Sequence, residues 1–388
     1  MLEFSINAAA LGNLSAFYFY SYVAMQIPTG LLADRLGPRK LLTAGALVAA
    51  VGGVSFGLAP SLAMALAGRL LVGASVAVAF VGMMKIASRW FAARQFATAA
   101  GVSLLIGITG AVAAGVPLRM LVHSLGWRPV MVGSGLFTLL VAFAIYRFSA
   151  DDPSERGYTS HAPPIPEGES NEVSVIKSLR TVTHVPNTWL ILLALAGFCG
   201  PMLAFNGLWG VPYCVTRFGI TPEEAAGITS ASLLAQGLAS PLAGWFSDKI
   251  ARRKIPLAIG IVTATGAWLV ALLIDSLSVG MFTFAMVVAG FASGSMVIGF
   301  AYAKESVPAR YAGTVGGVIN MGTMGGPMLL QPAIGFMLDH NWSGAVQGGV
   351  RTYDLAAFDS AFILILVWLG ISCLAILPTS ETFGKQRP

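Results

Sequence analysis

Two short charged segments of this sequence repeat one pattern at a distance of 214 residues. Residues 30–40 and 244–254 each contain a glycine, an aspartate four residues later, a basic residue directly after the aspartate, and a basic pair at the end. Asp34 falls at the C-terminal end of a predicted helix, where a carboxylate opposes the helix dipole and needs a positive partner. The pattern therefore indicates ionic contacts, and its recurrence indicates an internal duplication.

One acid outside the two segments completes this charged motif. Glu305 is placed to pair with the second segment, whereas its repeat counterpart is Arg89, so the first segment lacks a matching acid. A loop that is simply basic would explain the lysines and arginines, but not glycine and aspartate at a fixed spacing. The residues assigned to the motif are Gly30, Asp34, Arg35, Gly37, Arg39, Lys40, Gly244, Asp248, Lys249, Arg253, Lys254 and Glu305.

Arg69 is the only lysine or arginine placed well inside a long apolar run. A guanidinium is costly to bury in lipid, so it should face other helices or water and have a partner or a ligand. Two roles are open for Arg69. It could bind an anionic group of a substrate or modulate a nearby acid, or it could be a structural residue that reaches the membrane interface or caps backbone carbonyls.

Polar side chains recur at helical spacing on three further apolar runs. The three stripes are Tyr18, Tyr22 and Gln26, then Asn206, Trp209 and Tyr213, then Ser232, Gln236 and Ser240. Such residues favour partners or water over lipid, so the stripes indicate either a wet pathway or hydrogen bonds between helices. The residues that we expect to line a substrate cavity are Arg69, Tyr18, Tyr22, Gln26, Asn206, Trp209, Tyr213 and Gln236.

Enzyme signatures are weak in this sequence. Residues 53–57 match the G-x-S-x-G pattern of serine hydrolases, but they lie inside an apolar run and not at a strand-to-helix turn. The chain has no G-x-x-x-x-G-K phosphate loop, and its four histidines and three cysteines form no spaced ligand set. The sequence therefore predicts no enzyme, no catalytic residue, no cofactor and no metal site.

The elements that carry these residues are long apolar helices. Charged residues make up 10% and hydrophobic residues 56% of the 388 positions, against roughly 25% charged residues in a soluble domain. A helix needs about 20 apolar residues to cross a bilayer. Reading each apolar run as one span gives eleven spans, at residues 9–32, 41–59, 62–84, 96–118, 129–148, 188–213, 225–246, 255–274, 279–302, 313–338 and 358–378.

Basic residues sort onto alternate loops between these spans. One side holds eighteen lysines and arginines, whereas the other side holds four, which are Arg119, Arg128, Arg217 and Arg351. Because lysine and arginine are retained on the cytoplasmic side during insertion, we expect both charged segments and the C-terminus to be cytoplasmic and the N-terminus external. The net charge of +6 therefore reports membrane topology and does not indicate nucleic-acid binding.

The doubled charged segment resembles the loop between the second and third helices of major facilitator superfamily (MFS) transporters, and its copy between the eighth and ninth helices. Residues 69–77, with arginine four positions before a glycine, resemble the fourth-helix motif of this family, although Val72 departs from the polar residue often found there. The resemblance covers most of the chain. It implies an all-α membrane protein with the MFS fold, built from two pseudo-twofold-related helical bundles.

The resemblance also implies a role for the first charged segment. In the family, the aspartate corresponding to Asp34 faces the N-terminus of a helix from the other bundle, here the span that starts near Ala312, and so closes the cytoplasmic side. Arg35, Arg39 and Lys40 would organise this latch and hold the loop against anionic headgroups. The first of the family's twelve helices has no counterpart here, and we hypothesise that the sequence starts at an internal methionine of a longer reading frame.

An acidic and proline-rich stretch divides the chain. We expect an N-terminal bundle at residues 1–148 (family helices 2–6), a cytoplasmic linker at 149–187 that acts as a mobile tether, a C-terminal bundle at 188–380 (family helices 7–12) and a cytoplasmic tail at 381–388. Glycines are frequent within the spans, which is typical either of close static packing or of a moving boundary between bundles.

These observations predict a secondary active transporter that moves a small solute, with an organic anion as first choice, by alternating access. Two alternatives stay open, a multidrug efflux porter and a truncated or sensory relative that does not transport. Since no nucleotide site is present, the energy would come from a gradient of the solute or of a coupling ion such as a proton. We expect a multi-pass monomer of the inner membrane whose partners are the solute and the lipid bilayer, with no nucleic acid.

Overall fold

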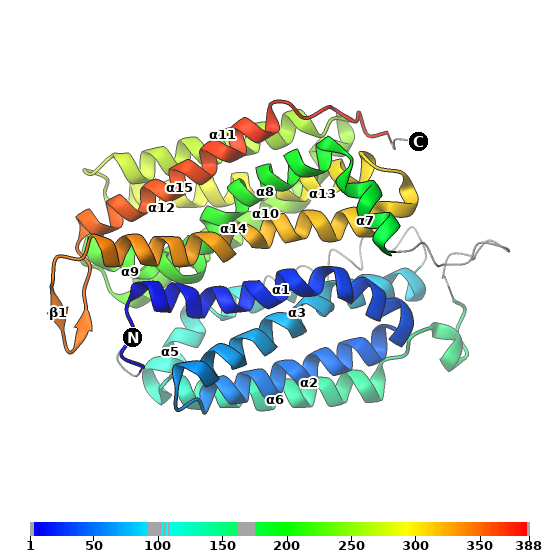
Figure 1. Cartoon of the computed structure of the whole chain (residues 1–388), viewed down its shortest axis with the longest axis horizontal. Coiled ribbons are helices and arrows are strands. Elements are labelled where there is room, and N and C mark those ends of the chain that lie inside the picture. Colours follow the sequence, from blue (N-terminus) through cyan, green and yellow to red (C-terminus); the bar gives the residue numbers. More distant parts are fainter. Residues whose placement is uncertain (1–3, 92–102, 104–105, 108, 161–174, 386–388) are drawn as a thin grey trace.

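The computed structural model describes residues 4–91, 103, 106–107, 109–160 and 175–385. Its long helices run side by side, with the N-terminus and the C-terminus at opposite ends of the molecule (Figure 1). We call the face at the N-terminus the external face and the opposite one the cytoplasmic face, after the orientation predicted from the basic residues. The helices form two groups, one from each half of the chain (Figure 1).

The N-terminal half consists of apolar helices with defined ends. Their bounds are α1 Ala8–Leu36, α2 Pro38–Gly57, α3 Leu62–Trp90, α5 Val116–Leu125 and α6 Trp127–Phe148. The side chains of Asn7 and Ser61 accept hydrogen bonds from the first turns of α1 and α3, which satisfies amides that have no partner within the helix. On α6, Phe137, Leu140 and Phe143 are each at least 64% exposed, as expected of a helix that faces lipid.

The C-terminal half holds the larger core. Its elements are α8 Pro186–Ala204, the π-turn η3 Phe205–Trp209, α9 Gly210–Phe218, α10 Pro222–Lys249, α11 Lys254–Leu273, α12 Val279–Ser293, α13 Met296–Glu305, the 3₁₀ turn η4 Ala309–Tyr311, α14 Ala312–His340, β1 Val346–Gln347, β2 Val350–Arg351 and α15 Leu355–Ile376. Phe205 at the π-turn packs edge-on against Trp268 and Phe362, so aromatic side chains fill the centre of this half.

Seven of the described helical segments are long and apolar enough to cross a membrane, and they lie at α2, α3, α6, α8–α9, α11, α12–α13 and α15. The predicted spans at 9–32, 225–246 and 313–338 are also helices, namely α1, α10 and α14. Two of the three predicted polar stripes lie on α1 and α10. The predicted span at 96–118 falls partly outside the described residues, so the number of eleven spans is not confirmed as a count.

The linker differs from the predicted mobile tether at both of its ends. A 3₁₀ turn, η2 Pro153–Arg156, follows α6, and the helix α7 Val175–Thr183 precedes α8. Ala150 and Val182 are buried, the latter within the core of the C-terminal half. The described ends of the linker are therefore packed against the two groups of helices. Residues 161–174 lie outside the described part. The predicted division into two bundles, a linker and a tail stays a prediction.

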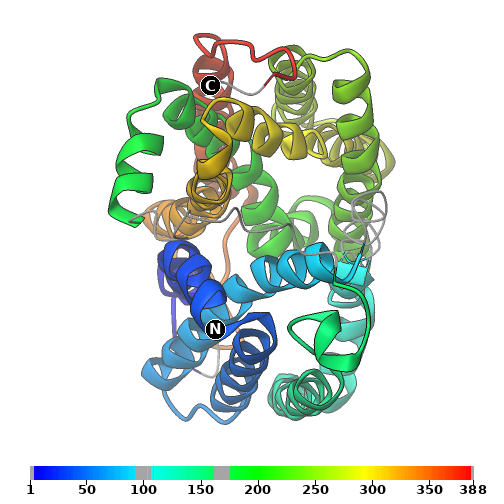
Figure 2. The ribbon, with the colours of Figure 1, turned by 90° about the vertical axis from the view of Figure 1, so that its right-hand side faces the viewer.

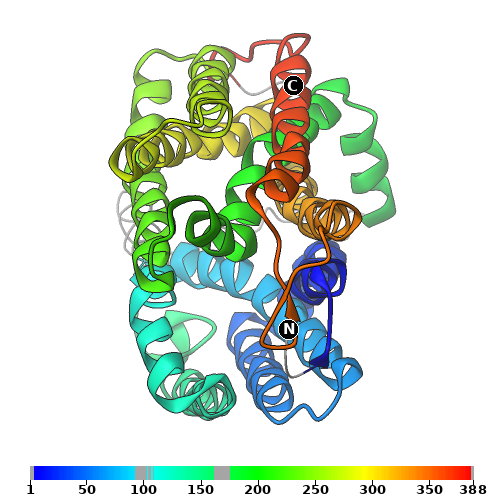
Figure 3. The same cartoon turned by 90° about the vertical axis from the view of Figure 1, so that its left-hand side faces the viewer.

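The two halves meet along α1 and α14, which lie side by side in every view (Figures 1, 2 and 3). Seen from the external face, the hairpin of β1 and β2 reaches from the C-terminal half toward the N-terminus (Figure 3). The core of the C-terminal half also includes Ala8, the first residue of α1. The junction between the halves is therefore continuous with a packed core at the external face.

Candidate functional site

Arg69 lies on α3 between α1 and α2. Its guanidinium carbon is 5.3 Å from the centre of the Phe56 ring. In the described part of the chain its Nε atom is buried without a hydrogen-bond partner, and the neighbouring ionisable group is the phenol of Tyr18 rather than a carboxylate. Arg217, by contrast, donates to the backbone carbonyl of Ile274 at 2.6 Å. Arg69 thus has one donor, Nε, without a hydrogen-bond partner among the described residues.

Glycines hold the helices around Arg69 close together. A side chain at Gly73 would overlap the backbone carbonyl of Tyr18, and one at Gly68 would lie 2.8 Å from the carbonyl oxygen of Gly52. The backbone of α3 therefore touches α1 on one side of Arg69 and α2 on the other. This contact fixes the depth and direction of the guanidinium.

Two of the predicted cavity residues meet a residue of the other half. Asn320 on α14 donates from Nδ2 to the Tyr22 hydroxyl at 3.1 Å and to Gln26 Oε1 at 3.0 Å. The ring of Tyr22 stacks on Tyr18 with the centres 6.0 Å apart, so a chain of polar side chains leads from Arg69 to the junction of the halves. Asn320 was absent from the sequence prediction, although an asparagine within a glycine-rich apolar span is a usable signal.

Asn206 and Gln236 are the predicted cavity residues of the C-terminal half that have polar side chains outside its aromatic core. Asn206, in the π-turn, donates to the Ser232 hydroxyl at 3.4 Å. Its Oδ1 and the Oε1 atom of Gln331 on α14 are both buried, without a hydrogen-bond partner among the residues that the structure describes. Gln236 on α10 places its Nε2 3.4 Å from the sulfur of Met296. The amides of Asn206 and Gln331 therefore keep free acceptor capacity beside a π-turn, a feature that is frequent at functional sites.

Trp209 and Tyr213 lie in the core of the C-terminal half rather than on a cavity wall. Trp209 is 2% exposed and donates from Nε1 to the Gln331 carbonyl at 3.0 Å. Tyr213 is fully buried, packs at a tilt against Phe362 with the ring centres 4.7 Å apart, and accepts a hydrogen bond from Arg217 at 2.6 Å. Their polar atoms already have partners, so their spacing with Asn206 reflects packing of this helix within its own half.

The first charged segment forms the turn between α1 and α2. Gly37 has a φ of +77°, and the backbone N–H of Arg39 donates to the Asp151 carboxylate at 2.6 Å. The Arg39 side chain donates to the Tyr146 carbonyl at 3.0 Å. Asp151, which follows α6, supplies an acid to the first charged segment. The comparison of the two repeats did not predict this acid, because the counterpart of Glu305 is Arg89. Arg35 and Lys40 are exposed, whereas the surroundings of Gly30 and the side chain of Asp34 lie outside the described part of the structure.

The second charged segment closes around Arg253. Its guanidinium donates to Glu305 at 2.7 Å and to Asp248 at 2.5 Å. Burial opposes the charge on Arg253, but the hydrogen bonds to Glu305 and Asp248 outweigh it and raise the pKa above its ordinary value. The backbone N–H groups of Arg253 and Lys254 donate to Glu381 at 2.8 and 3.0 Å. Arg253 is therefore a fixed, charged hub of the cytoplasmic face.

The two flanking members of the second segment differ from this hub. Lys249 lies over the Trp245 ring with its ammonium nitrogen 5.0 Å from the ring centre. Gly244 faces α13, where an added side chain would lie 3.8 Å from Val297. These two residues sit at the edge of the ionic cluster and take no part in it.

The contact between α1 and α14 is tighter at the external end than at the cytoplasmic end. Near the external face, a side chain added to Gly12 would lie 2.5 Å from the carbonyl oxygen of Gln331. Toward the cytoplasmic face, one added to Gly317 would lie 3.8 Å from the carbonyl oxygen of Gln26, and one on Gly313 would meet no atom within 4 Å. The two helices are therefore closest at the external end and in looser contact at the level of Gly317.

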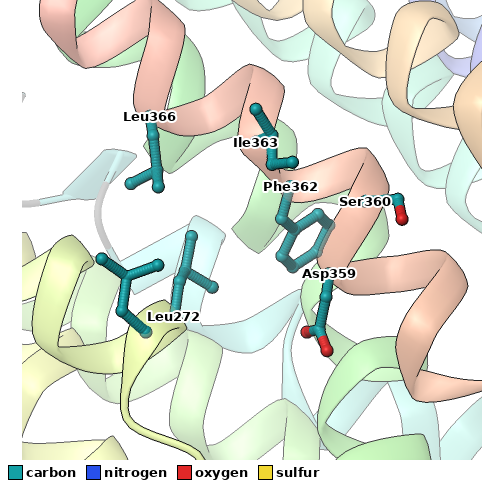
Figure 4. Close-up of a pocket in the computed structure, with 7 residues that line it drawn as sticks. Leu272, Asp359, Ser360, Phe362, Ile363 and Leu366 are labelled. Atoms are coloured by element: carbon teal, nitrogen blue, oxygen red, sulfur yellow. The ribbon is translucent and has the colours of Figure 1, made fainter.

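A separate cavity of about 270 Å³ lies between α11 and α15 (Figure 4). It is lined by Leu272, Leu273, Asp359, Ser360, Phe362, Ile363 and Leu366. These helices lie on the side of the C-terminal half that is remote from α1, α2 and α3 (Figure 1). The cavity is therefore separate from the polar chain that starts at Arg69.

Comparisons with known proteins agree with this architecture. A family model described as the Major Facilitator Superfamily matches residues 1–209 and 202–387. A probable galactarate/D-glucarate transporter of Bacillus subtilis is 24% identical over 82% of this chain and 75% of its own length. A probable sulfoacetate transporter of Cupriavidus necator is 24% identical over 100% of this chain and 88% of its own length.

Among solved structures, the chain is similar to a bacterial homolog of the human lysosomal transporter Spinster in an inward-facing and unoccupied conformation. The TM-score is 0.74 at 19% identity, and the match covers 99% of this chain and 92% of that chain. At this identity the likeness is one of fold.

Proposed function

The chain belongs to the major facilitator superfamily, whose members are multi-pass membrane transporters and not enzymes, and we propose that it carries a small organic anion by secondary active transport. The observation that carries this proposal is Arg69. A guanidinium within a membrane-spanning helix is costly unless a partner compensates it. Here its Nε has no hydrogen-bond partner and no carboxylate neighbours it among the described residues. An anionic substrate would supply the missing charge and acceptors.

The unsatisfied amides of the C-terminal half suggest what the rest of the substrate looks like. Oδ1 of Asn206 and Oε1 of Gln331 are buried acceptors that receive no hydrogen bond within the described part of the chain. A buried acceptor favours a ligand that brings a donor, such as a hydroxyl group. The relative named as a probable galactarate/D-glucarate transporter is named for hydroxylated diacids, and the one named for sulfoacetate is also named for an organic anion. We therefore propose a hydroxylated carboxylate as the substrate class.

The transport cycle would alternate the opening of the two faces. The tighter contact between α1 and α14 at the external end supports an inward-facing state for this structure. The similar bacterial homolog of Spinster is itself in an inward-facing conformation. The charged motif, with Arg253 at its hub and Asp34 as the proposed latch, would set the energy of the cytoplasmic closure.

We also propose a membrane location and an energy source for transport. The predicted excess of lysine and arginine on one side supports an inner-membrane protein with a cytoplasmic C-terminus. The sequence has no G-x-x-x-x-G-K phosphate loop that would bind a nucleotide. A gradient of a proton or of another ion would therefore drive symport with the anion. A monomer is the proposed unit.

The test is ligand-dependent thermal stabilisation of the purified protein. A ligand present at about 100 times its Kd stabilises the folded state by about 2.7 kcal/mol. We expect hydroxylated mono- and dicarboxylates to raise Tm, and lipophilic cations typical of drug efflux to leave it unchanged. The reverse selectivity would contradict the proposal and favour the efflux alternative.

Two arginine variants make this test specific. Arg69→Gln should abolish the ligand-induced rise in Tm while leaving the unliganded Tm the same or higher, because it removes an uncompensated charge. Arg217→Gln is the matched control. It removes hydrogen bonds to Tyr213 and Ile274 and should lower the unliganded Tm, yet keep the ligand-induced rise. A ligand response that survives in Arg69→Gln would refute the assigned role.

A further inference from the structure

Asp339, near the end of α14 at the external face, bonds across the junction to the other half of the chain. Its Oδ2 accepts a hydrogen bond from the backbone N–H of Ala9 at 2.8 Å, and its Oδ1 accepts one from Ala8 at 3.3 Å. Ala8 and Ala9 are the first two residues of α1. A carboxylate of the C-terminal half therefore caps a helix of the N-terminal half, more than 300 residues away in sequence.

The cap is favourable for two physical reasons. The first amides of a helix lack partners within the helix, and the N-terminus carries partial positive charge, so a carboxylate is stabilised there. Asn7 satisfies the amide of Ala10, which leaves the amides of Ala8 and Ala9 for Asp339. The carboxylate has little exposure to water, with its side chain 12% accessible, and this strengthens its electrostatic contacts.

Two residues on the stretch from the external hairpin to α15 orient this carboxylate. The Tyr353 hydroxyl donates to Asp339 at 2.6 Å, and Arg351 lies 3.3 Å from the same oxygen. The Tyr353 hydroxyl also accepts from the Ala8 amide at 3.1 Å. Burial, and then the hydrogen bond to Asp339, raise the pKa of Tyr353 to about 12, so the phenol stays a proton donor at physiological pH. Tyr353 and Arg351 belong to the same half as Asp339, so they orient its carboxylate independently of α1.

A second contact closes the same face on the other side of the junction. Arg119 on α5 lies 4.0 Å from Glu223 on α10. Beside this pair, a side chain at Gly115 would overlap the Ser230 hydroxyl. The external ends of the two halves therefore meet at two places, where α1 contacts α14 and where α5 contacts α10. Separation of α1 from α14 at this face must break the Asp339 cap.

We propose that Asp339 is an external latch that stabilises the state closed to the outside, opposite in effect to the latch proposed for Asp34 at the cytoplasmic face. The inference rests on the proposed alternating access. The two aspartates stand at the C-terminal ends of α14 and α1, and each would cap a helix of the opposite half. Loss of Asp339 should therefore shift the protein toward an outward-open state, whereas loss of Asp34 should shift it inward.

The experiment measures cysteine accessibility in membrane vesicles without any substrate. One reporter is Leu11→Cys, at a position on α1 that packs against the core of the C-terminal half near the external face. The other is Gly313→Cys, at the cytoplasmic end of α14, where an added side chain meets no neighbour. Membrane-impermeant maleimide is applied from the external or the cytoplasmic side, and the chain without an added cysteine gives the background.

Asp339→Asn should raise external labelling of the Leu11→Cys reporter about tenfold, in line with the loss of charged hydrogen bonds, and should lower cytoplasmic labelling of the Gly313→Cys reporter. Asp354→Asn is the matched control. Asp354 also caps a helix at the external side, through a 2.9 Å bond to Ala357, but within its own half, so its loss should leave both labelling rates unchanged.

Other outcomes overturn the latch. If both reporters gain labelling together, Asp339 stabilises the fold and not one state. If neither reporter changes, or if Asp354→Asn has the same effect, the cap has no part in gating. The labelling needs no substrate, so a failure to find a stabilising anion would defeat the substrate proposal alone.

Discussion

The backbone N–H of Arg253 donates a 2.8 Å hydrogen bond to the carboxylate of Glu381, which follows the last helix of its half. In the N-terminal half, the backbone N–H of Arg39 donates to Asp151 at 2.6 Å, and Asp151 likewise follows the last helix of its half. Arg39 and Arg253 occupy the same position of the repeated segment. Each half therefore closes its own cytoplasmic turn against an acid that comes after its final helix.

This relationship predicts that Asp151 stabilises the first charged segment. Asp151→Ala removes the bond to the amide of Arg39, and we expect a loss of about 1–3 kcal/mol, the cost typical of a lost charged hydrogen bond. Unfolding followed by Tm in detergent measures the effect. Asp152→Ala is the control, because within the described residues the hydrogen bonds of Asp152 are local, to Ser154 and Ser160. Equal losses for both variants would contradict the prediction.

The two charged segments differ in the type of residue that has a positive φ in the turn. Gly37 has a φ of +77°, and its repeat counterpart Ala251 has a φ of +49°. An alanine in this left-handed region costs roughly 1–2 kcal/mol, so Ala251→Gly should raise stability by about 1 kcal/mol. Gly37→Ala should lower it, since an added side chain would lie 2.6 Å from Asp151 Oδ2. Thermal unfolding of both variants checks the opposite signs, and a drop in Tm for Ala251→Gly would argue against a strained turn.

Arg253 is predicted to be the most costly charge to remove from the cytoplasmic face. Glu305 is 13% exposed and would be left without its cation in Arg253→Gln. Breaking a buried pair in this way costs about 3–5 kcal/mol. Arg252→Gln is the control, because Arg252 is exposed and lies over the Phe383 ring at 5.2 Å. Similar Tm values for both variants would show that the cluster around Arg253 is solvated.

Asp34→Asn should bias the protein toward its inward-open state, because a weakened cytoplasmic latch favours separation on that side. The Gly313→Cys reporter should gain cytoplasmic labelling, and the Leu11→Cys reporter should lose external labelling. Unchanged accessibility at both faces would refute the role of Asp34. Asp34→Asn and Asp339→Asn are expected to change the labelling of each reporter in opposite directions. The two variants together therefore test whether the two faces open alternately.

The sequence predicts the helices well because their signal is local. An uncharged run long enough to cross a bilayer has few alternatives to a helix. The sequence also suggested Glu305 as an ionic partner of the second charged segment, and in the structure Glu305 lies 2.7 Å from Arg253. Comparison of the repeats failed for Asp151, because the acid of the first half comes from a different element than Glu305.

Contacts between distant segments were the part that the sequence could not supply. Nothing near Asp339 or Asn320 in the sequence indicates that they meet α1, since that pairing arises only when the halves dock. The spacing of Trp209 and Tyr213 with Asn206 could not separate cavity from core, because tyrosine and tryptophan are amphipathic and pack in both.

The central claim, that Arg69 binds an organic anion in transit, is tested most directly by counterflow in proteoliposomes. Vesicles loaded with an unlabelled hydroxylated carboxylate chosen from the thermal-shift panel receive a trace of the labelled compound outside. Exchange of this kind needs no ion gradient, so the unknown coupling ion does not affect it. We predict transient accumulation of label with the wild-type chain and with Arg217→Lys, and none with Arg69→Gln. Accumulation by Arg69→Gln at the wild-type rate would contradict the account.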